Sequence, residues 1–81
     1  MKVTVRLFAV ARQWAGQGLV ELDLPEGATV GQLRAALADR FPQLSSAAGR
    51  LMFAVGTEYA HDGQRLGAGA EVACIPPVSG G

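Results

Sequence analysis

The sequence has few of the residues on which catalysis, metal binding and covalent cross-linking depend. Its 81 residues include a single cysteine, Cys74, and a single histidine, His61. One cysteine cannot form an internal disulfide, and the pair cannot supply the three or four ligands of a zinc site. We expect Cys74 to be a small buried hydrophobe on a strand and His61 to be a solvated loop residue. Neither a phosphate-binding loop nor a G-x-G-x-x-G motif occurs, since Gly67 and Gly69 lack a third glycine, so the sequence predicts no bound metal or nucleotide.

The sequence also lacks an excess of charge of either sign and any long apolar run. Seven basic and seven acidic side chains balance to a formal net charge of zero, whereas proteins that bind nucleic acid concentrate basic side chains on one surface. No apolar run approaches the roughly 20 residues that cross a bilayer. Met1-Lys2 opens an alternating strand and not the apolar core of a signal peptide. We therefore expect a cytoplasmic protein with no nucleic-acid or membrane partner, in agreement with its single cysteine.

Hydrophobic periodicity divides the chain into five strands and one main helix. Residues 2–9 alternate between apolar and polar side chains, which is typical of a strand with one buried face. Further strands are expected over residues 19–24, 51–55, 57–60 and 71–75. Gly-rich turns and a short helical turn join the first two strands, and this spacing predicts an antiparallel hairpin. The third strand is apolar throughout and is expected to be buried.

The main helix is predicted to begin at Val30. Thr29 and Gln32 have the spacing of a capping box, in which each side chain binds a free backbone N–H group of the first turn. The apolar residues of this segment recur every three or four positions and form one stripe: Val30, Leu33, Leu37 and Phe41. Pro42 ends the helix, because proline disfavours helical geometry at the residue before it.

The order strand, strand, helix, strand, short strand, strand predicts an α+β fold. One helix must cover one face of one mixed sheet of about five strands, which is a β-grasp arrangement over residues 1–75. The crossover rule favours a last strand that lies parallel to the first in the centre of the sheet. Five apolar residues would then face the helix: Val3, Val5, Leu7, Val72 and Cys74. Phe8 and Ile75 would lie near each other on the open face.

The chain ends on a segment with few large side chains. Residues 76–81 read Pro-Pro-Val-Ser-Gly-Gly. The prolines carry no N–H group and end sheet pairing, whereas the glycines lack a Cβ and can pass through a slot that admits little more than backbone. From Pro77 to Gly81 this flexible tail reaches at most about 16 Å, at roughly 3.3 Å per residue. We interpret its terminal carboxylate as the working group; the alternative is an ordinary frayed terminus.

The tail and the strand before it resemble the small subunit of molybdopterin synthase, the MoaD family. The Pro-Pro-Val-Ser-Gly-Gly ending is the most specific part of the resemblance. Support along the chain comes from Leu7-Phe8-Ala9, Arg12, Thr29-Val30, Leu37, residues 51–55 and Glu71-Val72-Ala73. The chain departs from the family, which often has Asn, Asp-Gly-Asp and Phe, at Gly56, residues 68–70 and Ile75.

The resemblance implies a ubiquitin-like sulfur carrier that binds no cofactor. In the family, a MoeB-like adenylating enzyme uses ATP to convert the C-terminal carboxylate, here that of Gly81, to an acyl adenylate. Sulfur from a persulfide donor then gives a thiocarboxylate. The tail enters the large subunit, MoaE, where sulfur is transferred to cyclic pyranopterin monophosphate (precursor Z) to form the dithiolene of molybdopterin. Catalytic residues would belong to the large subunit, in a heterotetramer of two large and two small subunits.

The resemblance also implies roles for single residues. Gly81 would carry the sulfur, and four residues would thread the partner's site: Gly80, Ser79, Val78 and Pro77. Three residues are candidates for the docking face, although apolar side chains on a small sheet are more often just packing: Phe8, Tyr59 and Ile75. The alternatives are a sulfur carrier for thiamin or cysteine synthesis, a ubiquitin-like protein modifier and a purely structural interaction module.

Overall fold

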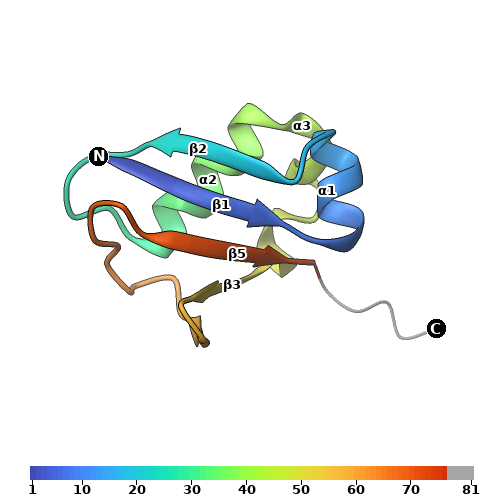
Figure 1. The fold of residues 1–81 in the computed structure, drawn as a ribbon. Helices are drawn as coiled ribbons and strands as arrows, with labels where there is room; N and C mark the ends of the chain where they lie inside the picture. Colours follow the sequence, from blue (N-terminus) through green and yellow to red (C-terminus); the bar gives the residue numbers. More distant parts are fainter. Residues whose placement is uncertain (77–81) are drawn as a thin grey trace.

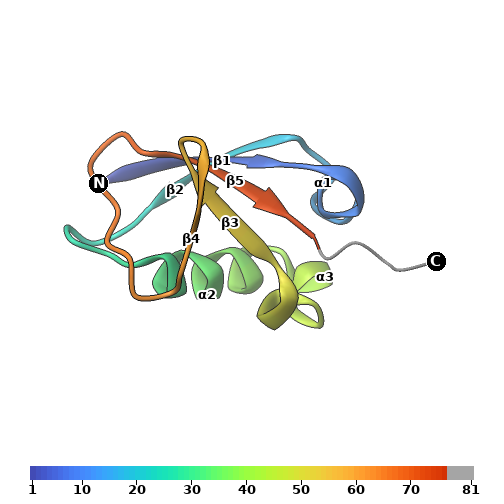
Figure 2. The ribbon, with the colours of Figure 1, turned by 90° about the horizontal axis from the view of Figure 1, so that it is seen from below.

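The computed structural model describes residues 1–76, which form a five-stranded mixed sheet with helices packed on one face (Figure 1). In chain order the elements are β1 (Lys2–Leu7), α1 (Ala9–Ala15), β2 (Leu19–Asp23), α2 (Val30–Arg40), α3 (Pro42–Ser45), the 3₁₀ helix η1 (Ala48–Arg50), β3 (Met52–Val55), β4 (Glu58–Ala60) and β5 (Glu71–Ile75). Figure 2 shows α2 and α3 beneath the sheet, while the opposite face of the sheet is bare of helices within residues 1–76. We call these the covered face and the open face.

The strand order is β2-β1-β5-β3-β4, so β5 lies in the centre of the sheet. β5 runs parallel to β1, with Leu7 opposite Cys74, and antiparallel to β3 (Figure 1). β1 pairs antiparallel with β2, and β3 with β4. The predicted first hairpin and the predicted central, parallel position of the last strand are both confirmed.

The start of α2 confirms the predicted capping box. The backbone N–H of Gln32 donates to Oγ1 of Thr29 at 3.3 Å, and the N–H of Thr29 donates to Oε1 of Gln32 at 2.8 Å. The next two N–H groups of α2 donate to backbone carbonyls in residues 62–64, both at 2.9 Å. The free donors of the first turn are thus satisfied, and the loop between β4 and β5 is fastened to the helix.

The core lies between α2 and the covered face. The sheet residues that point toward the helices are buried: Val3, Val5, Leu7, Val20, Leu22, Phe53, Val72 and Cys74. Val30, Leu33 and Leu37 of α2 meet them, as predicted. Burial raises the pKa of the Cys74 thiol to about 11, against a smaller lowering by the charge of Arg34. Cys74 is therefore the small buried hydrophobe that the sequence predicts.

Arg34 joins α2 to the segment before β3 and to the loop after β4. Its guanidinium donates hydrogen bonds to the carbonyls of Ala48 and Leu51, both at 2.6 Å, and to Oδ1 of Asp62 at 2.7 Å. The guanidinium carbon also lies 5.0 Å from the centroid of the Phe53 ring, a cation–π contact. The side chain is only 19% exposed. Arg34 thus fixes where β3 begins relative to the helix.

The first strand ends earlier than the sequence predicts. It was expected to continue to Ala9, but β1 ends at Leu7. The carbonyl of Phe8 accepts hydrogen bonds from the N–H groups of Ala11 and Arg12, at 3.1 and 3.4 Å, so the chain already turns into α1. Ala9 takes a φ of 52°, in the left-handed region that residues other than glycine rarely adopt.

Candidate functional site

Exposed apolar side chains gather on the open face. Within residues 1–76 the large hydrophobic side chains that are exposed are Phe8 (46%), Leu19 (50%), Met52 (47%) and Tyr59 (65%). Ile75, also on this face, is partly buried. We call these five residues the apolar patch. Contiguous apolar surface of this kind is typical of sites that bind other proteins.

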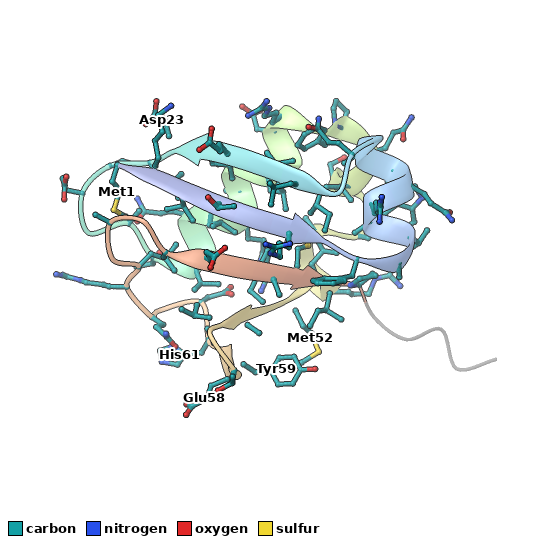
Figure 3. The ribbon with its side chains drawn as sticks, viewed as in Figure 1. Met1, Asp23, Met52, Glu58, Tyr59 and His61 are labelled. Carbon is teal, nitrogen blue, oxygen red and sulfur yellow. The ribbon has the colours of Figure 1, made fainter. Side chains whose placement is uncertain are left out.

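Strand register shows that the patch is continuous. One row of residues across the open face runs Leu19, Arg6, Ala73, Ala54 and Tyr59. In the next row, toward the end of β5, Met52 stands opposite Ile75, and the N–H of Phe8 donates to the carbonyl of Cys74 at 3.2 Å. Figure 3 shows Met52 and Tyr59 beside each other, with Asp23 at the opposite end of the sheet. The patch therefore occupies the end of the open face at which β5 finishes.

The structure brings the three predicted docking residues onto one face. Phe8 lies just past the end of β1, but its extended backbone angles, φ −117° and ψ 156°, continue the alternation and direct its side chain away from the core. Leu7 is opposite Cys74, so Phe8 follows beside Ile75, as predicted. Their role in docking stays a prediction. The predicted tail residues lie outside the described part of the chain: Pro77, Val78, Ser79, Gly80 and Gly81.

Two members of the patch, Leu19 and Met52, were missed in the sequence. The strand over 51–55 was predicted to be buried, which is wrong for Met52, because β3 has one face on the core and one on solvent. The available signal was the alternation itself. Met52 has the opposite parity to Leu51 and Phe53, and residues of opposite parity point to opposite faces. The same rule applies to Leu19, which precedes the buried Val20.

The other end of the open face is polar. Thr4 on β1 stands between Glu21 and Glu71, and Lys2 stands opposite Asp23. A hollow of about 190 Å³ lies where the polar and apolar ends meet, and it is lined by Arg6, Gly56, Glu71, Val72 and Ala73. Polar and apolar groups therefore meet beside the centre of the sheet.

Gly56, one of the three departures from the resembled family, lies in the turn between β3 and β4. Its φ is 64°, a conformation that both glycine and the asparagine often found in the family tolerate. Glycine at this position is therefore compatible with the same turn between β3 and β4. It also leaves the edge of the hollow without a side chain.

The described residues also lack a metal-binding cluster. Within residues 1–76, no three His, Cys, Asp or Glu side chains are grouped so that they could hold a metal ion. His61 is exposed, as predicted, and its Nδ1 accepts a hydrogen bond from the N–H of Gly63 at 3.1 Å. In the same part of the chain, no helix is long and apolar enough to cross a membrane. Within residues 1–76 the candidate site is therefore the apolar patch on the open face.

Comparison with solved structures defines the class of protein. The small archaeal modifier protein SAMP1 from Haloferax volcanii is 32% identical, covers 100% of both chains and superposes with a TM-score of 0.87. A putative molybdopterin converting factor, subunit 1, from Pyrococcus furiosus is 31% identical over 96% of this chain and 99% of its own, with a TM-score of 0.86. The fold is therefore a ubiquitin-like β-grasp domain, as predicted.

Comparison of sequences then gives the family. The chain belongs to the ThiS family, whose pattern matches residues 5–81. It is 37% identical to the molybdopterin synthase sulfur carrier subunit of Chlamydomonas reinhardtii, over 100% of both chains. The match extends through the Gly-Gly ending, which the fold alone would not require.

Proposed function

We propose that this chain is the sulfur-carrier subunit of a molybdopterin synthase and that Gly81 carries the sulfur. The observation that supports this most is the full-length similarity to molybdopterin synthase sulfur carrier subunits, with 37% identity to the one from Chlamydomonas reinhardtii. The resemblance of the Pro-Pro-Val-Ser-Gly-Gly ending to the small-subunit family agrees with it. The chain would act as a sulfur donor without catalytic residues of its own.

The chemistry requires activation of the terminal carboxylate. A carboxylate is a poor electrophile, whereas an acyl adenylate is a good one, so the outer sulfur of a persulfide can attack the carbonyl carbon and displace AMP. The product is an acyl disulfide, and a second thiol then cleaves its sulfur–sulfur bond, which releases the thiocarboxylate and leaves a disulfide on the donor. The resulting thiocarboxylate is a soft nucleophile. Because the sequence carries no nucleotide-binding motif, we propose that a MoeB-like adenylating enzyme binds the ATP.

The acceptor would be a large subunit that binds the apolar patch and receives the tail. β5 ends at Ile75, and residues 76–81 span at most about 20 Å when extended, at roughly 3.3 Å per residue. The pocket that receives Gly81 must therefore lie within about 20 Å of the end of β5, which the patch borders. We propose that the large subunit supplies the catalytic groups, transfers sulfur to cyclic pyranopterin monophosphate and assembles as two large and two small subunits.

Intact mass spectrometry tests the proposal. The full chain is incubated with the adenylating enzyme, ATP, a persulfide donor and a thiol reductant, and we expect a mass gain equal to the exchange of one oxygen for one sulfur. Deletion of Gly81 should abolish the gain while leaving the circular dichroism spectrum unchanged. Addition of the large subunit and cyclic pyranopterin monophosphate should then yield molybdopterin. Sulfur uptake by the shortened chain would contradict the assignment of Gly81.

A second function, protein modification, is favoured by the likeness to SAMP1, which is named a small archaeal modifier protein. The same activated carboxylate would then form an isopeptide bond with lysines of target proteins. Such conjugates would migrate slowly on denaturing gels of a cell extract and disappear on deletion of Gly81. A carrier for thiamin or cysteine synthesis would be distinguished by its sulfur acceptor.

A further inference from the structure

Arg6 is a positive charge within the apolar half of the open face. It stands in the row between Leu19 and Ala73. Phe8, two residues further along the same face, belongs to the apolar patch. A partner that covers the patch must therefore also cover Arg6.

The guanidinium of Arg6 is weakly engaged within the described chain. Its Nη2 lies 3.9 Å from Oε1 of Glu71, too far for a hydrogen bond, and the two side chains are 61% and 69% exposed. Exposed ion pairs of this kind contribute little to stability. Arginine offers five N–H donors in a planar fork that suits a carboxylate. Arg6 therefore has donors to offer to a partner.

The hollow beside Arg6 has room for a partner's side chain. Its volume of about 190 Å³ lies beside the small Ala73 and beside Gly56, which has no side chain. That is several times the roughly 30 Å³ that one water molecule occupies in the liquid. A side chain entering from above the sheet would meet the guanidinium at the edge of the hollow.

Electrostatics decides the chemistry of that side chain. A wholly apolar partner surface would take water away from Arg6 without replacing its hydrogen bonds, which is unfavourable. We infer that the surface that binds the apolar patch is itself apolar and presents one carboxylate to Arg6, so that Arg6 helps to select the partner. The inference uses the proposed function to identify the partner as the large subunit.

A second copy of this chain fits the patch less well. In a twofold contact centred on the patch, the same surface faces itself. The two Arg6 side chains would then approach each other, and like charges repel. The proposed function gives a further reason for a different protein, because the large subunit that receives Gly81 must come within about 20 Å of the end of β5, which the patch borders.

The test measures the dissociation constant of the full chain for the recombinant large subunit of molybdopterin synthase. We expect Arg6→Glu to weaken binding about tenfold or more, because it places two carboxylates together. Lys2→Glu is the matched control. It makes the same change of charge on the same strand and the same face, but at the polar end, and we expect an effect within about twofold.

Glu71→Gln sharpens the test. It removes the carboxylate that competes for Arg6, so we expect the variant to bind the large subunit a few-fold more tightly than wild type does. In the Arg6→Glu background the same change should increase the affinity by a smaller factor. Thermal unfolding of each variant checks the fold, and Arg6→Gln replaces Arg6→Glu if the charge reversal is unstable.

The outcomes separate the inference from the proposed function. If Arg6→Glu binds as wild type does, or weakens no more than Lys2→Glu, the inference is wrong, while sulfur uptake at Gly81 still supports the carrier. If the wild-type chain neither takes up sulfur nor binds the large subunit, both are wrong. A concentration-dependent dimer that Phe8→Asp abolishes would assign the patch to a second copy and overturn the inference.

Discussion

The covered and open faces are made from alternate residues of the same strands, yet they differ in what their apolar side chains do. On β3, Phe53 points toward the helices and is 1% exposed, whereas Met52 beside it is 47% exposed. Burial of apolar surface contributes roughly 25 cal/mol per Å² to folding, and an exposed side chain forgoes most of it. The covered face thus stabilises the domain, while the open face leaves apolar side chains exposed to solvent.

The largest expected effect separates these two neighbours. Phe53→Ala should lower the free energy of unfolding by about 3–5 kcal/mol, because it leaves a cavity in the core. Met52→Ala should cost less than about 1 kcal/mol but should weaken binding of the large subunit. Urea unfolding and a binding titration measure the two effects. Phe53→Leu serves if the alanine variant does not fold, and equal losses of stability at both positions would contradict the division between the faces.

Next in size is the contribution of Arg34. Arg34→Met keeps the aliphatic stem but removes the hydrogen bonds to Ala48, Leu51 and Asp62, and should lower the free energy of unfolding by about 2–4 kcal/mol.

Arg40→Met is the control for Arg34. Arg40 also donates to a backbone carbonyl, that of Glu21 at 2.8 Å, and lies 5.5 Å from the Phe41 ring, but it is exposed. If Arg34→Met lowers the free energy of unfolding no more than Arg40→Met does, burial of Arg34 contributes nothing to stability. If Arg34→Met also weakens binding, the covered face sets the position of Met52 on the open face.

Cys74 gives the covered face a dependence on pH. Its pKa is raised by burial from 9.0 to about 11. The unfolded chain loses the thiol proton at lower pH than the folded chain, so the stabilisation is complete below pH 9 and is lost as the pH rises toward 11. The loss amounts to about 2–3 kcal/mol. Urea unfolding below and above this window, with Cys74→Ala as control, measures it; the same pH dependence in both proteins would exclude Cys74 as its source.

The smallest expected effect concerns the point at which the chain leaves the open face. Ala9→Gly should raise the free energy of unfolding by about 1 kcal/mol, because glycine accepts the φ of 52° without strain. Ala11→Gly, in the same helix at a buried position with ordinary helical geometry, should lower it by a similar amount or more. Thermal unfolding of the two variants measures both effects. Destabilisation by both changes would argue against strain at Ala9.

Much of the fold could be predicted because its signals are local. The capping box of Thr29 and Gln32 and the apolar stripe of α2 both depend on residues that are only three or four positions apart. The position of β5 followed from a general rule on crossover connections, and it placed Phe8 beside Ile75. The end of β1 was not predicted, because nothing in residues 2–9 indicates that a helix begins at Ala9.

The candidate site was predicted only in part. Phe8, Tyr59 and Ile75 were named, but Leu19 and Met52 were not, because their exposure depends on which side of the sheet the helices cover. The contacts of Arg34 were also missed, since its partners lie up to 28 residues away along the chain.

The sequence by itself determined the strands, the helix start and the alternation that divides each strand between two faces. It also specified the Gly-Gly ending, which the β-grasp fold of the described residues does not require. Only the tertiary structure decided that residues from five separate segments form one apolar patch around Arg6. The physical reason is that hydrogen bonds between strands far apart in the sequence set the register, and register determines which side chains become neighbours.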